Sequence, residues 1–342
     1  MKYALDDKPS LFPLLMYGLQ WWVVSLPCIV IMGLVVSRLH YPGLAEQSLY
    51  MQKLFGLMGL ATAAQALWGH RLPLVVGPAS TLLVGIVASQ GSGIAAVYTA
   101  LLVGGGLLAL ASYSGVLRKL RCFFTPRIVA VILILIAFTL SPTIQALILA
   151  GAGPSSMQLL FALCLVLALV VCNTLLPGVW KSLTVLIGIA GGSLGYFLAF
   201  GFPDLPATAS NGPAMPLLIP SLQFHPGTIT AFLFCYLALL INELGSIESI
   251  GQMLKAEGME GRIQRGTGLQ GVFNMLAGGL GVIGPVDSSM SAGVIAATGC
   301  ASRFTLVPAG IGLALCAFFP GMVLLLSCIP SVVMGARMLY LM

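Results

Sequence analysis

Long apolar runs, separated by short polar connections, make up almost the whole sequence. A helix needs about 20 apolar residues to cross the hydrocarbon core of a bilayer. By this criterion we count twelve candidate spans, of which the third and the tenth are short and interrupted by Gly and Pro. The spans cover residues 12–36, 51–69, 73–90, 94–116, 127–149, 157–176, 181–202, 228–252, 267–283, 285–300, 304–320 and 321–341. The pattern predicts an all-α polytopic membrane protein.

Composition supports this class and excludes others. Of the 342 residues, 59% are hydrophobic and 7% are charged, against about 25% charged in soluble domains. Soluble, disordered and nucleic-acid-binding classes are therefore excluded, despite a net charge of +6. With the N-terminus in the cytoplasm, thirteen of the fifteen Lys and Arg residues lie on the cytoplasmic side, as the positive-inside rule requires.

Little in the sequence indicates an enzyme or a metal site. The eight cysteines form no CxxC pair, and we interpret them as small packing residues. There is no HExxH motif or Ser-His-Asp set. We interpret His40, His70 and His225 as loop or interface residues.

Two distant segments resemble each other. Residues 75–81 read Val-Val-Gly-Pro-Ala-Ser-Thr, and residues 282–288 read Val-Ile-Gly-Pro-Val-Asp-Ser. Their Gly-Pro pairs lie 207 residues apart, in the third and tenth spans. Spans whose numbers differ by seven cross the membrane in opposite directions, so the pattern predicts an inverted-repeat transporter. In such folds, interrupted helices meet near the middle of the membrane and offer backbone N–H groups to a substrate.

Three acidic residues, Glu243, Glu248 and Asp287, lie in apolar surroundings. A charge near the bilayer centre costs about 3 kcal/mol or more, so each is a candidate for function. Glu248 lies one turn from Gln252, and Gly245 leaves space beside it for a flat ligand. Glu243 lies about 140° from Glu248 around the helix; it either forms a structural hydrogen bond with another helix or belongs to the proton pathway. Asp287 either faces the substrate or caps the half-helix that follows.

Four motifs carry a resemblance to a known family. They are Gly18-Leu19-Gln20; Gly59-Leu60-Ala61-Thr62 with Gln65, Arg71-Leu72-Pro73-Leu74-Val75 and Gly77-Pro78; Glu248-Ser249-Ile250-Gly251; and Gly293 with Thr298 and Ala301-Ser302-Arg303. With these motifs, the sequence resembles the nucleobase–ascorbate transporter family, which includes xanthine and uracil permeases.

The resemblance implies a fold of fourteen spans in two inverted halves of seven, with short strands before the broken third and tenth helices. A core domain would comprise residues 1–125 and 227–320, and a gate domain would comprise residues 126–226 and 321–342. Residues 329–335 resemble the family's twelfth span, so we expect the sequence to lack the last two spans. The resemblance also implies a homodimer in the cell membrane and symport of a purine or pyrimidine base with a proton, or with sodium. No cofactor is implied.

The resemblance also assigns site residues by position. Glu248 would hydrogen-bond the base and couple to a proton, together with Gln252 and Glu243. The other substrate-binding candidates are Gln20, Ala79, Ser80, Gly245, Asp287, Ser289, Met290, Ser291 and Gly293. The family's polar pair, a Gln or Glu followed by Asn, falls here at Met290 and Ser291. Asp287, Ser289 or Ser291 would therefore have to replace the missing side chain.

Two alternative functions remain open. One is an inorganic or carboxylate anion carrier on the same fold, which would need uncompensated positive charge near the broken helices. The other is a relative that no longer transports and instead binds or regulates, which predicts ligand binding without flux.

Overall fold

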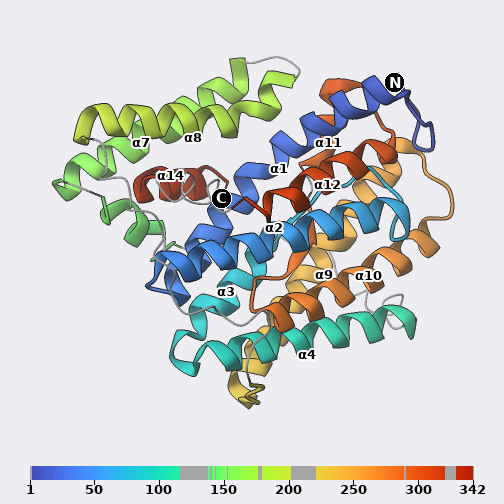
Figure 1. The fold of residues 1–342 in the computed structure, drawn as a ribbon, viewed down its shortest axis with the longest axis horizontal. Helices are drawn as coiled ribbons and strands as arrows, with labels where there is room; N and C mark the ends of the chain where they lie inside the picture. Colours follow the sequence, from blue (N-terminus) through green and yellow to red (C-terminus); the bar gives the residue numbers. More distant parts are fainter. Residues whose placement is uncertain are drawn as a thin grey trace.

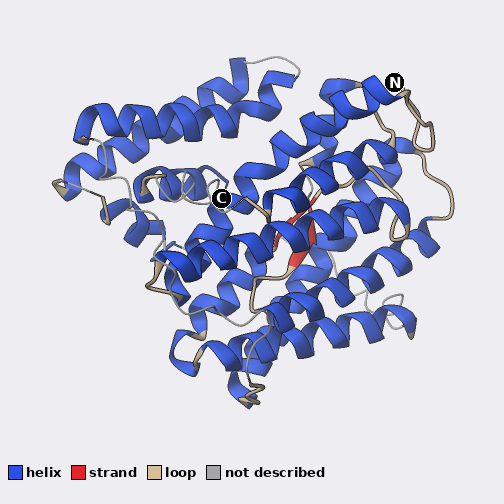
Figure 2. Ribbon diagram, in the orientation of Figure 1, coloured by secondary structure: helices blue, strands red, loops and turns tan. Residues whose placement is uncertain are grey.

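The computed structural model describes residues 2–115, 138, 141–142, 144–151, 153–175, 179–201, 221–288, 290–319 and 329–341. The described residues are mostly helical, with one pair of short strands at the centre (Figures 1 and 2). The elements of the first half are α1 (Leu11–His40), α2 (Leu44–Leu67), β1 (Val76–Pro78), α3 (Ser80–Ala88), a 3-10 turn (Gln90–Ser92), α4 (Ile94–Tyr113), α7 (Ser155–Leu175) and α8 (Val179–Phe200). Those of the second half are α9 (Pro226–Leu254), α10 (Met259–Leu280), β2 (Pro285–Asp287), α11 (Ser291–Thr298), a 3-10 turn (Arg303–Thr305), α12 (Leu306–Cys316) and α14 (Ser331–Leu341).

The two short, interrupted spans are confirmed. Each begins as a three-residue strand and continues as a helix of eight or nine residues. Proline lacks the N–H that a helix needs and disfavours helical geometry in the residue before it. The Gly-Pro pairs therefore keep the chain extended before each short helix begins.

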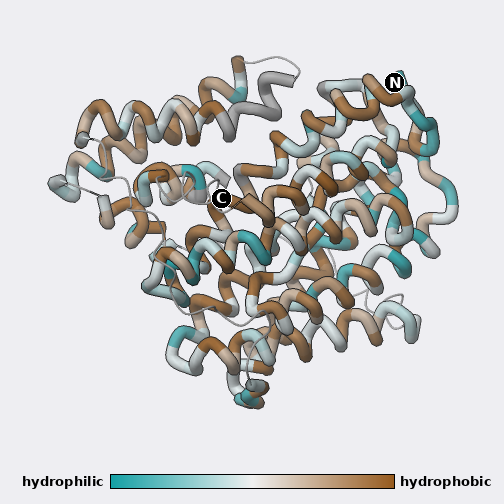
Figure 3. The backbone as a smooth tube through the Cα atoms, in the orientation of Figure 1, coloured by the Kyte–Doolittle hydropathy of each residue, from teal (hydrophilic) through white to brown (hydrophobic). Residues whose placement is uncertain are grey.

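Four helices are long and apolar enough to cross a membrane, among the residues the structure describes: α1, α4, α7 and α9. Hydrophobic residues predominate along them in Figure 3. Most of the expected span at residues 127–149, and the first part of that at 321–341, lie outside the described residues. The protein is a multi-pass membrane protein of mainly helical structure.

The two strands pair antiparallel, with Pro78 directly opposite Pro285. The pairing continues beyond the strands, because Ala79 donates its N–H to the carbonyl of Gly284 at 2.9 Å. Ser288 donates to the carbonyl of Val75 at the same distance. The corresponding prolines of the two similar segments thus face each other at the centre of the antiparallel pairing.

The helices around the strands also pair between the two halves of the chain. Helix α2 packs along α12 and α10 packs along α4, while α1 contacts α12 and α9 contacts α4. Both long contacts depend on glycine: an added Cβ at Gly59 would overlap the backbone of Gly310, and one at Gly271 would overlap the backbone of Ala109. Small residues that allow helix backbones to approach closely are typical of membrane helix interfaces.

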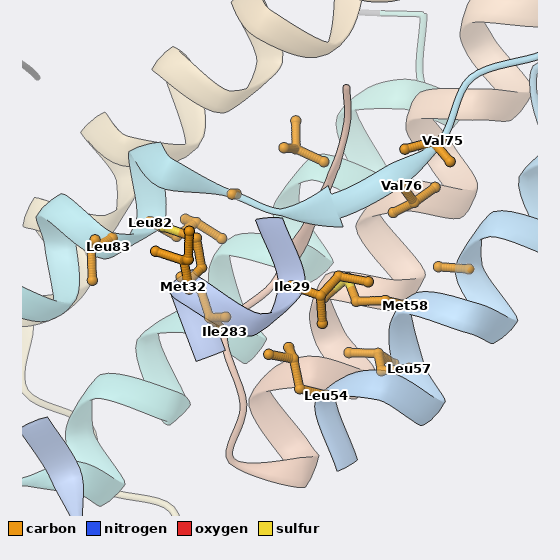
Figure 4. Packing of buried hydrophobic residues seen from close by; sticks show 14 of the residues in the cluster. Ile29, Met32, Leu54, Leu57, Met58, Val75, Val76, Leu82, Leu83 and Ile283 are labelled. Carbon is orange, nitrogen blue, oxygen red and sulfur yellow. The ribbon is translucent and has the colours of Figure 1, made fainter. Parts of the chain in front are cut away.

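The buried core lies between these helices. Figure 4 shows Ile29, Met32 and Leu54 together with Val76 and Ile283, which come from α1, α2, β1 and the segment before β2. Helices α7, α8 and α14 pack against one another, and α8 also contacts α1 and α11. In Figure 1 these three helices lie to the left of the helices that surround the strands.

Candidate functional site

The strand pair brings the N-termini of two short helices to the centre of the molecule. Helix α3 begins directly after β1, and α11 begins a few residues after β2. No side chain caps either N-terminus. The first N–H groups of a helix have no partner within the helix and carry partial positive charge. The two helix starts therefore offer hydrogen-bond donors to a ligand with acceptor groups.

A buried carboxyl group on α9 holds the end of β2. Glu243 has no exposed surface, and its Oε2 accepts the N–H of Asp287 at 3.0 Å. One turn later, Ser246 donates its hydroxyl to the carbonyl oxygen of Asp287 at 3.2 Å. Residues three apart share one face of a helix, so this face of α9 is directed at β2.

The carboxyl group of Asp287 meets a histidine from the other half of the chain. His70 Nε2 lies 3.2 Å from Asp287 Oδ2, and both side chains are fully buried. Because Leu72 donates its N–H to His70 Nδ1 at 2.9 Å, the ring hydrogen must lie on Nε2 and point to Asp287. Glu243, Asp287 and His70 thus form a buried polar cluster, which we call the carboxyl cluster. Two buried carboxyl groups this close favour a state in which one of them holds a proton.

Amide and hydroxyl side chains surround the carboxyl cluster. Gln65 of α2 donates to Gln270 Oε1 of α10 at 2.8 Å and to the carbonyl of Gly266 at 2.9 Å. Asn274 donates to the carbonyl of Pro285 at 3.1 Å and accepts from Tyr236 at 3.2 Å. Buried polar networks of this kind fix the geometry of the groups inside them, so the cluster is held from both halves of the chain.

Two of the predicted glycines leave open space beside the strands. A Cβ added at Gly245 on α9 or at Gly293 on α11 would have no heavy atom within 4 Å, and α9 contacts α11. Ser80 at the start of α3 is exposed, whereas Ala79 beside it is buried. Each of these two glycines therefore leaves open space at its own helix surface.

Other predicted candidates have different surroundings. Ser291 is buried, and its hydroxyl accepts the N–H of Val75 at 3.0 Å, which ties α11 to the first repeat. Met290 is half-buried and is the N-cap residue of α11. Gln20 of α1 is half-buried, with an amide nitrogen that has no partner in the described structure. Ser289 lies outside the described residues.

The structure places Glu243, rather than Glu248, against the strand pair. Glu248 is half-buried five residues further along α9, and Gln252 is exposed near the end of that helix. The expectation that Asp287 caps the following half-helix is wrong, because Met290 is the N-cap residue and no side chain caps α11. Asp287 instead points to His70.

Sequence reasoning missed His70. It lies in the connection between α2 and β1, as expected for a loop residue, but it is completely buried. The available signal was its position just before the first Gly-Pro segment. No group of three or more His, Cys, Asp or Glu residues that could hold a metal ion occurs in the part of the chain that was described.

Comparison with known proteins gives consistent matches. The xanthine/uracil permease model, described as "Permease family", matches residues 12–342. Protein CPE0397 of Clostridium perfringens is 27% identical over 97% of this chain and 75% of its own length. Nucleobase transporter PlUacP of Paenibacillus larvae is 26% identical over 86% of this chain and 70% of its own. Uric acid permease PucJ of Bacillus subtilis is 25% identical over 81% of this chain and 65% of its own.

Two solved structures share the fold. The transmembrane domain of the cyanobacterial bicarbonate transporter BicA has a TM-score of 0.70 and 17% identity, over 98% of this chain and 89% of that one. SLC26A9 has a TM-score of 0.56 and 13% identity, over 95% of this chain and 56% of that one. At these identities, the likeness concerns the fold alone.

Proposed function

Because the chain belongs to the xanthine/uracil permease family, we propose that it carries a purine or pyrimidine nucleobase across the cell membrane by proton symport. The observation that carries the proposal is the carboxyl cluster at the end of β2, beside the open space at Gly245 and Gly293. Relatives named as a nucleobase transporter and a uric acid permease support the substrate class.

The edge of a nucleobase carries N–H and C=O groups in one plane. Glu243 Oε1 and Asp287 Oδ1 are buried without a hydrogen-bond partner in the described structure, and Asp287 Oδ2 faces His70. These oxygens can accept N–H groups or hold a proton. The free N–H groups at the start of α3, with the Gln20 amide, supply donors for C=O groups. A base between α3, α9 and α11 would thus form hydrogen bonds with acceptors of the carboxyl cluster and with donors at the start of α3.

The proposal includes proton coupling because the same carboxyl cluster would bind the base and hold the proton. A carboxyl group that holds a proton presents a donor, and the same group without the proton presents only acceptors. Binding of the base and protonation of Glu243 or Asp287 therefore depend on each other, because each changes the hydrogen bonds available to the other. Buried ionisable groups inside membrane proteins commonly form such proton relays.

The transport step would move one group of helices against another. We assign residues 1–125 and 227–320 to a moving core and residues 126–226 and 321–342 to a gate, with the N-terminus in the cytoplasm and two copies in a dimer. The packing of α7, α8 and α14 against one another supports this division. The interleaved contacts of α2 with α12 and of α4 with α10 favour movement of the core as one body.

A matched pair of variants tests the mechanism. Purified protein is reconstituted in liposomes, and uptake of labelled xanthine and uracil is measured with and without an inward proton gradient. Glu243→Gln preserves shape and removes the ionisable group, so we expect loss of gradient-driven uptake. Glu248→Gln makes the same chemical change on the same helix outside the cluster, and we expect substantial uptake to remain. Full coupled uptake by Glu243→Gln would refute the mechanism, and loss only in Glu248→Gln would transfer the role to Glu248.

The same assay separates the alternatives. An anion carrier, which the shared fold of BicA and SLC26A9 allows, would take up bicarbonate or sulfate and ignore bases. A protein that binds without transporting would show saturable base binding in detergent and no uptake into liposomes.

A further inference from the structure

A buried cation lies on the last described helix. Arg337 of α14 is only 2% exposed, and its Nε and Nη1 atoms have no hydrogen-bond partner among the described residues. Arginine is almost never fully buried without a partner. An ionisable residue inside a membrane protein is by default a candidate for function, with its partner to be identified.

The elements around Arg337 supply no carboxylate. Helix α14 packs on α7 and α8, and none of α1, α7, α8 and α14 contains an Asp or Glu. The ionisable groups that act on the guanidinium from the described residues are Cys28 of α1 and Tyr340 of α14. Two of the acids in membrane-spanning elements, Glu243 and Asp287, are engaged with each other and with His70. The positive charge of Arg337 is therefore uncompensated in the described structure.

Its position links α14 to the strand pair. Cys28, which lies within electrostatic range of Arg337, has its sulfur 3.5 Å from the place of a Cβ at Gly77 in β1. Gln20, with its unpartnered amide nitrogen, lies about two turns before Cys28 on α1 and about 80° from it around the helix. In Figure 1, α14 lies on the left side of the molecule, and the C-terminus is drawn near its middle.

We propose that Arg337 binds the negative charge of the cargo, and that the cargo is an oxopurine in its anionic form, such as urate or the monoanion of xanthine. This inference rests on the proposed function and names its substrate class. The guanidinium presents a planar fork of N–H donors that can hold two acceptor atoms on one edge of a charged heterocycle. The opposite edge would remain for the carboxyl cluster and the starts of α3 and α11.

Three proteins and two probes test the assignment. Binding is measured in detergent near neutral pH by calorimetry for wild type, Arg337→Lys and Arg337→Met. Urate is anionic there, and hypoxanthine, of similar shape, is neutral. We expect Arg337→Met to lose affinity for urate by about ten- to a hundredfold, the worth of a hydrogen bond to a charged group. Hypoxanthine affinity should change less than threefold on the same scale, and Arg337→Lys should retain most urate affinity.

Other outcomes overturn the assignment. An equal loss of urate and hypoxanthine affinity would give Arg337 a structural role, and unchanged urate affinity would exclude contact. Wild type that binds hypoxanthine but not urate would overturn this inference and leave the proposed function standing. Wild type that binds no base but binds bicarbonate or sulfate would overturn both.

A measurement on wild type alone covers the case in which Arg337→Met does not fold. Xanthine affinity is followed from acid to alkaline pH across the first ionisation of xanthine, with hypoxanthine below its own ionisation as the control for titration of the protein. We expect the xanthine-to-hypoxanthine affinity ratio to rise as xanthine becomes anionic. A constant or falling ratio would overturn the inference.

Discussion

The contact between α4 and α10 depends on Gly271, and this dependence can be measured against a glycine of the same helix. An added Cβ at Gly271 would overlap the backbone of Ala109 on α4 and lie 2.8 Å from its Cα. Gly279, two turns further along α10, has no heavy atom within 4 Å of an added Cβ. The variants Gly271→Ala and Gly279→Ala therefore make the same covalent change, with and without a neighbour.

The expected difference follows from two opposing effects. Alanine favours a helix over glycine by about 0.5–1 kcal/mol, and this gain applies to both positions. Overpacking of a tight contact costs about 1–3 kcal/mol, and this loss applies only to Gly271, whose neighbour is a main chain that cannot rotate away. We expect Gly279→Ala to be neutral or slightly stabilising, and Gly271→Ala to be less stable than Gly279→Ala by about 1–3 kcal/mol.

The assay is thermal unfolding of both variants and wild type in one detergent, followed by tryptophan fluorescence and by loss of the monodisperse chromatographic peak. A decrease of a few degrees in the midpoint of Gly271→Ala relative to Gly279→Ala would agree with the argument. Equal midpoints would show that α4 accommodates an added Cβ at Gly271 without cost, which would refute the close packing of α4 on α10. Gly59→Ala at the corresponding contact of α2 with Gly310 provides an independent repetition.

Two further predictions concern the strand pair. The double-mutant cycle of His70→Leu and Asp287→Asn should show a coupling of about 1 kcal/mol or more in thermal unfolding, because each single change leaves a buried group unpaired; additive effects would contradict the contact. Ser291→Ala removes the acceptor of the Val75 N–H and should lower the free energy of unfolding by about 1–3 kcal/mol. Ser80→Ala should lower the affinity for the base with little effect on unfolding. The reverse pattern would place Ser291, not Ser80, at the ligand.

Much of the fold could be predicted from the sequence, because backbone chemistry determines it locally. The Gly-Pro pairs at residues 77–78 and 284–285 lie in apolar spans, and proline there forces an extended segment before a short helix. That signal needs no knowledge of distant contacts, and both broken spans were confirmed. The pairing of α2 with α12 and of α4 with α10 could not be predicted from the sequence, because the paired helices are far apart along the chain.

The site was predicted less completely, for a geometrical reason. Glu243 and Glu248 both lie in apolar surroundings on one helix, and composition cannot say which of their faces meets β2. The choice depends on the rotation of α9, which Ser246 and Glu243 reveal through their bonds to Asp287. His70 could not be identified either, because its burial comes from the packing of a connection rather than from a regular element. Arg337 could not be singled out either, because its burial depends on how α14 packs on α7 and α8.

The two repeats are alike in backbone and unlike in chemistry, and this difference bears on the mechanism. At corresponding positions in the two halves, 207 residues apart, the first repeat has Ser80 and the second has Asp287. Both carboxyl groups of the cluster belong to the second half, while His70 of the first half closes it. Under the proposed mechanism, one acidic half against one half without a carboxyl group at this position would confine proton exchange to a single place. The uncompensated cation on α14 then lies outside the group of helices that holds the cluster, so that a negatively charged cargo would meet the proton-binding groups on one side and Arg337 on the other.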